Sequence, residues 1–211
     1  MCTRNALAKT KEEFSARDPL QMAELSGAQY SPDRFSLAYC GLPVTVAYPG
    51  GAAELDGAHP PLSYDEKVLL LQYLSSACGL PPRGQWLSFL DLRGGPLHWL
   101  PFQREALNPL ARHYHDRLDH FLAVGLEHGG EKVEMGDAAV VVPVLPRLSL
   151  AFILWQGDTE FPPRGMILFD SVAEAYLSTA ALYVLAIQAM VRIWFPGDTR
   201  FEGNNNSTVK E

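Results

Sequence analysis

The sequence predicts an α+β fold, on three observations. Residues 148–155 and 165–169 are strongly apolar and joined by an acidic turn, which indicates two buried strands. Residues 138–144 add a third apolar run. Helical segments lie before and after these strands without a regular alternation of strand and helix, which argues against a doubly wound sheet. We expect one compact domain over residues 1–202, with a mostly antiparallel or mixed sheet packed by about four helices, and a disordered polar tail over residues 203–211.

The N-terminal quarter predicts helix followed by hairpin. Residues 6–26 carry apolar side chains loosely on one side, so we expect a first helix there. Pro19 interrupts the pattern, and two short helices fit it equally well. Residues 35–39 and 43–48 are rich in strand formers and are separated by a glycine, which predicts a hairpin. Glycine, alanine and proline dominate residues 50–61, which we interpret as a loop.

The clearest helix start lies at Ser63. Ser63 and Glu66 form the pattern of a capping box, in which each side chain bonds the backbone N–H of the other residue. The helix that follows is expected to end at Gly79. Residues 85–92 then alternate in the manner of a strand.

The middle of the chain predicts one long helix. Asn108 followed by a proline is typical of a helix start, and Gly129 marks the end. Apolar residues at spacings of four, four and three form one stripe between them: Leu110, Tyr114, Leu118 and Phe121. Two prolines in and after the next strand, Pro143 and Pro146, indicate an edge or a bend.

The C-terminal part predicts two further helical segments. Ser171 and Glu174 repeat the capping-box pattern. Ala180–Phe195 is apolar apart from Gln188 and Arg192, and its 16 residues are too few for a membrane span, which needs about 20. We interpret it as a buried helix, or as one that packs against a partner protein or a second copy of the chain.

Composition excludes several classes of protein. The 211 residues carry a formal net charge of −7 without a cluster of Lys and Arg, so nucleic acid is not expected as a partner. Cys2, Cys40 and Cys78 are dispersed and form no CxxC pair, which argues against a disulfide framework and against a zinc or iron–sulfur site held by this chain alone. The N-terminus is charged where a signal peptide needs an apolar run, so we expect a cytoplasmic protein.

The acidic turn is the first candidate for chemistry. Asp158 and Glu160 lie two residues apart after Trp155, and Asp170 ends the returning strand. Three carboxylates near strand ends suit a hard cation such as calcium or magnesium, or a pair in which one group is an acid and the other a base. The alternative is a polar hairpin loop, with Asp170 capping the helix that follows it.

A second candidate is a helix face with His113, Asp116 and His120, whose spacings of three and four place them on one side of the predicted helix. Two imidazoles and a carboxylate suit a transition metal. The alternative is a solvated face, because these residues lie opposite the apolar stripe.

Two single residues complete the candidates. Cys40 precedes a glycine at a strand end, where it is either a reactive thiol or, by default, a buried structural cysteine. His98 and Trp99 follow a Gly-Gly turn and either line a ligand pocket or belong to a loop packed on the core.

Several segments carry a family resemblance in their order and spacing. They are Glu66–Leu74, Trp86–Phe89 with Gly94–Gly95, Pro101–Gln103, Leu145–Arg147, Phe152–Asp158, Glu160–Pro163 and Ile167–Asp170. Together they cover about residues 30–190, and they resemble the prokaryotic domain-of-unknown-function family 3786.

This resemblance implies a single α+β domain in a family found largely in anaerobes, with no established activity. Some members carry an added cysteine-rich iron–sulfur segment, which this chain lacks. Members often have an acidic pair after the leucine that matches Leu177, where this chain has Thr179, Ala180 and Ala181.

The resulting functional hypothesis is a small-molecule or cofactor-binding accessory protein of anaerobic metabolism. Phosphate-loop, GxGxxG, GxSxG and HExxH signatures are absent, so no particular cofactor is indicated. The expected ligand contacts are Trp155, Asp158, Glu160, Asp170, Trp86 and His98. One alternative is an interaction subunit that binds its partner through Ala180–Phe195, and another is a carboxylate- or metal-dependent enzyme built on the acidic turn.

Overall fold

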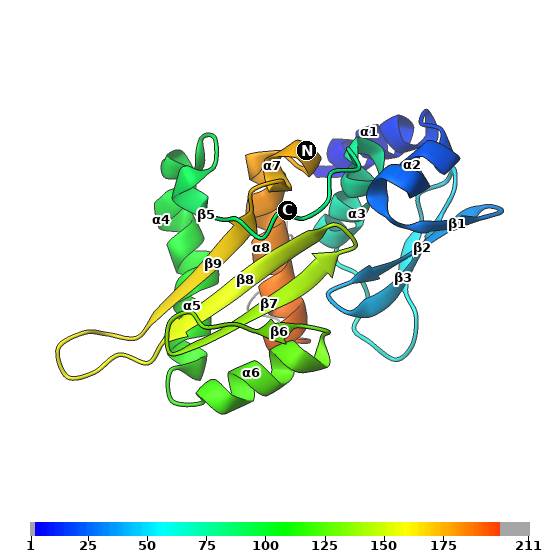
Figure 1. Cartoon of the computed structure of the whole chain (residues 1–211). Coiled ribbons are helices and arrows are strands. Elements are labelled where there is room, and N and C mark those ends of the chain that lie inside the picture. The colour runs from blue at the N-terminus through cyan, green and yellow to red at the C-terminus, as the bar shows by residue number, and fades with distance from the viewer. Residues whose placement is uncertain (1–2, 199–211) are drawn as a thin grey trace, which may run out of the picture.

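Two antiparallel sheets and the helices around them form the α+β fold that the sequence predicted (Figure 1). The computed structural model describes residues 3–198, so the predicted polar tail lies outside the described residues. The larger sheet has the strand order β5-β9-β8-β7-β6, and the three predicted apolar strands form its centre. Its strands are β5 (Trp86–Ser88), β6 (Glu131–Lys132), β7 (Ala138–Leu145), β8 (Leu148–Trp155) and β9 (Arg164–Asp170).

The smaller sheet contains the predicted hairpin and has the order β1-β2-β3-β4. Its strands are β1 (Gln29–Ser31), β2 (Arg34–Tyr39), β3 (Leu42–Ala47) and β4 (Ala53–Leu55). The interpretation of residues 50–61 as a plain loop was incomplete, because β4 lies within them. Ala53 pairs with Val46 and is buried, so the chain turns back after β3 and adds a strand.

The first predicted helix is divided, as the alternative interpretation of Pro19 allowed. α1 (Thr3–Ser15) and α2 (Pro19–Ser26) are separate helices. The Asp18 side chain accepts a hydrogen bond from the backbone N–H of Gln21 and so caps α2. Proline fits the first position of a helix because its missing N–H would have no partner there.

The capping box at Ser63 is confirmed, and it starts α3 (Tyr64–Ser76). The backbone N–H of Glu66 donates to Ser63 Oγ at 3.2 Å, and the backbone N–H of Ser63 donates to Glu66 Oε2 at 2.7 Å. The carboxylate of Glu66 is therefore held in place by the start of its own helix.

The strand predicted over residues 85–92 ends at Ser88. Asp91 Oδ2 accepts hydrogen bonds from both the backbone N–H and the hydroxyl of Ser88, so the chain folds into the 3-10 turn Phe89–Asp91 instead of extending. This local bonding outweighs the alternating pattern. A second 3-10 turn, Gly95–His98, leads into α4 (Trp99–Phe102).

The prediction of one helix from Asn108 to Gly129 was wrong at its start and in its middle. Helical structure already runs from α4 through the π-helical turn Gln103–Leu107 into α5 (Asn108–Tyr114). Pro109 lacks the N–H that would bond the Glu105 carbonyl, and the π-helical turn ends two residues before it. The chain breaks before α6 (Leu118–Glu127), where Arg117 has an extended φ of −137°.

The second predicted capping box does not form. Val172 precedes the short helix α7 (Ala173–Tyr176), and the Ser171 hydroxyl has no hydrogen-bond partner among residues 3–198. The carboxylate of Asp170 accepts from the backbone N–H of Val172, the residue just before α7, and no side chain caps the helix itself. Glu174 instead accepts from the backbone N–H of Arg93.

The last helix, α8 (Thr179–Trp194), lies behind the larger sheet (Figure 1). Trp194 packs on Phe152 of β8 with ring centroids 4.5 Å apart, and most of the apolar residues of α8 are buried. The apolar stretch is therefore a core helix covered by its own chain. Within residues 3–198, no helix combines the length and apolar character that crossing a membrane would require.

The two sheets meet where β7 bends. The register of β7 with β8 shifts between Pro143 and Leu145, as the prolines predicted. At this bulge the backbone N–H of Cys40 donates to the Val144 carbonyl at 3.0 Å. The turn at Cys40 and Gly41 also touches His128, whose Nδ1 lies 2.6 Å from the Cys40 carbonyl oxygen.

Gly41 tests the contact between this turn and His128, the residue that follows α6. Its φ is +76°, and a Cβ added there would lie 2.5 Å from the His128 carbonyl oxygen. We expect Gly41→Ala to lower the free energy of unfolding by about 2 kcal/mol or more, because strain in the left-handed region adds to a clash with backbone. Urea unfolding would measure it.

Gly50→Ala is the matched control, since a Cβ at Gly50 meets nothing within 4 Å. It should stay within roughly 0.5 kcal/mol of the parent chain. Equal stability of the two variants would show that the turn does not press on His128.

Candidate functional site

The candidate site is a cavity between the start of α3 and the end of α8. Its volume is about 310 Å³, at the low end of the range of roughly 300–1,000 Å³ that ligand pockets occupy. The lining residues come from two segments far apart in the sequence. They are Pro60, Pro61, Leu62, Ser63, Tyr64, Asp65 and Glu66 from the first segment, and Gln188, Val191, Arg192, Pro196, Gly197 and Asp198 from the second.

A buried ion pair lies in the wall of this cavity. Arg192 Nε donates to Glu66 Oε1 at 2.9 Å, and Nη2 donates to Glu66 Oε2 at 2.5 Å. Glu66 is 2% exposed and Arg192 is 8% exposed, so the pair is withdrawn from water. Two parallel hydrogen bonds of this kind fix both side chains in one orientation.

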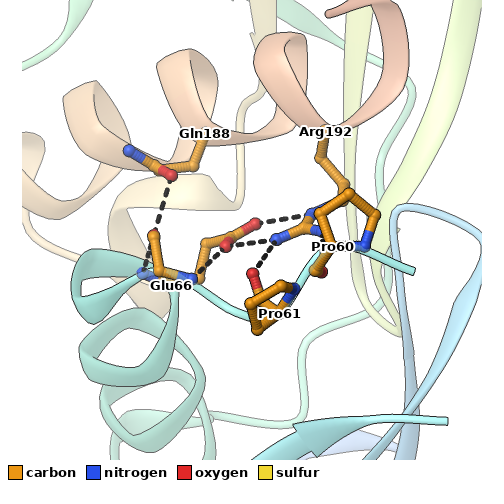
Figure 2. Close-up of polar contacts among 6 residues, drawn as sticks. Pro60, Pro61, Glu66, Gln188 and Arg192 are labelled. Carbon is orange, nitrogen blue, oxygen red and sulfur yellow. Dashed lines mark hydrogen bonds and ion pairs between the residues drawn. The ribbon is translucent and has the colours of Figure 1, made fainter. Parts of the chain in front are cut away.

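Carbonyl oxygens from the segment before α3 complete the surroundings of the guanidinium. Arg192 Nη1 donates to the Pro60 carbonyl at 2.7 Å, and Nη2 donates to the Pro61 carbonyl at 3.2 Å. Figure 2 shows Arg192 reaching from α8 to both prolines and to Glu66. Burying two charges costs several kcal/mol each, and their attraction and hydrogen bonds must offset this cost. The contacts to Pro60 and Pro61 contribute to that balance.

One turn earlier on α8, Gln188 makes a second link to the capping box. Ser63 Oγ and Gln188 Oε1 are 3.0 Å apart, so the serine hydroxyl donates to the amide oxygen while accepting from the Glu66 N–H. The amide of Gln188 therefore faces the same corner of the cavity as the ion pair (Figure 2).

Asp65 also lines the cavity, and its side chain is half-buried next to Glu66. Burial raises the pKa of Asp65, and the neighbouring negative charge of Glu66 raises it further. Among residues 3–198, Asp65 forms no salt bridge.

The charges of the ion pair affect the pKa values of the buried side chains of Tyr39 and Cys40. Burial raises the pKa of the Cys40 thiol well above its usual range, with Glu66 raising it and Arg192 lowering it. The thiol is therefore neutral, which supports a buried structural cysteine and not a reactive one. Burial also raises the pKa of Tyr39, and the neighbouring Cys40 raises it further.

The acidic turn forms a separate, more open cavity of about 550 Å³, lined in part by Trp155 and Asp158. Asp158 Oδ1 accepts from the backbone N–H groups of Phe161 and Glu160 at 2.7 and 2.8 Å, and these bonds lower the pKa of Asp158. The guanidinium of Arg164 lies 5.4 Å from the centre of the Trp155 ring. Glu160 is exposed in the turn.

Asp170 and Trp86 lie at the opposite end of β9, where they pair in the register of the sheet. About seven residues of strand, or roughly 20 Å, separate this end from the acidic turn. Asp170 is buried, and its carboxylate accepts from the backbone N–H groups of Arg83, Gly84 and Val172. The three predicted carboxylates therefore do not converge.

The histidine candidates are also dispersed. His98 is exposed on a 3-10 turn, away from the cavities described above. His113 belongs to α5 and His120 to α6, so the predicted shared helix face does not exist, and His113 packs on Phe195 with ring centroids 5.0 Å apart. Within residues 3–198, no three His, Cys, Asp or Glu side chains come together in a way that could hold a metal ion.

Sequence reasoning missed the Glu66–Arg192 pair as a site, although both residues carried a signal. Glu66 belonged to the clearest capping box, and Arg192 was the charged residue of the predicted helix Ala180–Phe195. A charge in a buried helix needs a partner of opposite charge. The partner could not be identified from the sequence, because the two residues are 126 positions apart.

The fold and this cavity define an α+β protein with a small cavity between the start of α3 and the end of α8. Residues 18–192 match the model of the family described as Domain of unknown function (DUF3786). The chain belongs to this family. Searches of curated proteins and of solved structures found no significant match.

Arg192→Met tests whether the ion pair is withdrawn from water. The variant leaves Glu66 buried without its counter-charge, and we expect the free energy of unfolding to fall by about 3–5 kcal/mol at neutral pH. The double variant Glu66→Gln/Arg192→Met removes both charges and keeps a side chain that can complete the capping box, so it should be more stable than Arg192→Met alone. Guanidinium unfolding of all three proteins would measure this, and a loss below 1 kcal/mol for Arg192→Met would contradict it.

Proposed function

We propose that this chain is a small-molecule-binding accessory protein whose ligand occupies the cavity beside Glu66 and Arg192. The observation that carries the proposal is a cavity of suitable volume with a rigid wall, a buried and hydrogen-bonded ion pair. A ligand that enters it meets polar groups already held in position, so little side-chain entropy is lost on binding.

The surroundings of the cavity combine apolar and polar groups, as small-molecule sites do. Pro60, Val191 and Pro196 provide apolar surface, and Asp65 and Gln188 provide polar groups. The ion pair joins α3, α8 and the segment before α3, so these three parts of the chain are fixed around the cavity.

We further assign this role to anaerobic metabolism, and the support for that part is the resemblance to a family found largely in anaerobes. No specific observation supports either alternative hypothesis, the interaction subunit or the carboxylate- or metal-dependent enzyme. The stretch Ala180–Phe195 packs mainly into its own core, and the carboxylates proposed for an enzyme lie at opposite ends of β9.

The cavity at the acidic turn is the second place for a ligand. Trp155 and Arg164 offer an aromatic face and a cation, and Phe161 is 67% exposed beside them. Of the ligand contacts predicted from the sequence, Trp155 and Asp158 line this cavity. The others do not line it: Glu160, Asp170, Trp86 and His98.

Native mass spectrometry of the full chain, purified without oxygen, tests the proposal. We expect a mass increment from a retained small molecule, and its loss in Val191→Trp, because the indole fills the cavity. Val184→Trp is the matched control, since Val184 is also half-buried on α8 but does not line the cavity.

A retained ligand that survives Val191→Trp but is lost in Trp155→Ser would move the site to the acidic turn. A clean apo mass for the parent chain would count against ligand binding altogether.

A further inference from the structure

The larger sheet has two faces, and the helices of residues 3–198 pack on one of them. On that face α6 lies against Val140 at Gly125, α5 lies against Gly165, and Trp194 of α8 packs on Phe152. Successive side chains of a strand point to opposite faces, so the residues between these point away from the helices. We call this other side the outer face. In Figure 1, α8 lies behind the sheet, and no described helix lies in front of β7, β8 and β9.

The outer face is apolar at its centre. Two rows of paired residues cross it: Leu168, Ala151 and Val141 form one, and Met166, Ile153 and Ala139 form the other. Three of these side chains are buried without belonging to the main core, and the other three are half-buried. Glu131 and Ser88 lie at the two ends of the first row. An antiparallel sheet with one face in water alternates apolar and polar residues, whereas an apolar centre within a polar rim is typical of a protein interface.

One end of the outer face carries two opposite charges that form no salt bridge among residues 3–198. They are Asp137, which directly precedes β7, and Arg164, which pairs with Trp155 in the register of β9 with β8. Both line the same cavity as Trp155, so they lie on its two sides. A half-turn about an axis along β8 exchanges these two sides. It places Arg164 of one copy opposite Asp137 of another, which makes the outer face complementary to itself.

We propose that the outer face binds a second copy of this chain face to face, as a two-fold dimer in which β8 of one copy lies over β8 of the other. Sheets that pack face to face keep their strand directions within about 30° of each other. This proposal is independent of the ligand cavity, and it uses a surface other than Ala180–Phe195.

The size of the outer face sets the strength of the dimer. The three long strands give a face of about 14 by 25 Å, and the edge strands extend it. The turn before β7 covers one corner, where Gly136 lies against Ile153 and Trp155. Two such faces bury on the order of 1,000 Å² in total, at the low end for a specific interface. We therefore expect a reversible dimer with a Kd in the micromolar range.

Sedimentation equilibrium of the full chain at micromolar concentrations tests the dimer. Leu168→Lys places a charge at the centre of the outer face and should raise the Kd about tenfold or more. Leu126→Lys is the matched control, because Leu126 is 47% exposed on α6, which packs on the opposite face of the sheet. It should leave the Kd unchanged.

Two charge variants test the two-fold arrangement. Arg164→Glu and Asp137→Lys each place like charges opposite each other in both symmetry-related contacts, so each variant alone should dimerise more weakly than the parent chain. In an equimolar mixture of the two variants, both contacts of the mixed dimer join opposite charges. Dimerisation of the mixture should therefore recover to about the parent level.

Three outcomes would overturn the proposal: a parent chain that stays monomeric at these concentrations, a dimer that Leu168→Lys leaves as tight as the parent, and charge variants that do not recover on mixing. Circular dichroism shows whether each variant is folded. If Leu168→Lys does not fold, the charge variants decide.

Discussion

The chain keeps two opposite charges inside its folded structure, on Glu66 and Arg192, and the surrounding elements are arranged so that these charges stay together. Separating them would leave a charge in an environment where water cannot solvate it, at a cost of several kcal/mol. The pair therefore sets where the end of α8 lies relative to the start of α3. It also holds the segment with Pro60 and Pro61, whose carbonyls accept from the guanidinium.

Glu66 has two roles that reinforce each other. As the third residue of the capping box it bonds the backbone of Ser63, and as the partner of Arg192 it joins α3 to α8. A local helix-start signal thus becomes one half of a long-range contact. The same residues form a wall of the cavity, so the interaction that orders this part of the fold also shapes the proposed ligand site.

Local patterns predicted the elements whose cause is local. The hairpin of β2 and β3, the central strands β7 to β9 and the start of α3 followed from apolar runs, glycines and the capping box. Predictions failed where a nearby side chain or a distant segment decided the outcome. Asp91 ended β5 by bonding Ser88, Pro109 followed a π-helical turn, and Asp170, not Ser171, bonded the backbone just before α7.

The sequence by itself determined the α+β class and the apolar character of the helix that ends in Trp194. The reason is that the spacing of apolar residues along the chain indicates which helices and strands are buried. It also supplied the resemblance to the family that residues 18–192 match. Only the tertiary structure decided the site. It separated Asp158 from Asp170 along β9, and it brought Arg192 to Glu66 across 126 residues. Spacing along the chain carries no information about such contacts, since they form through packing of the core.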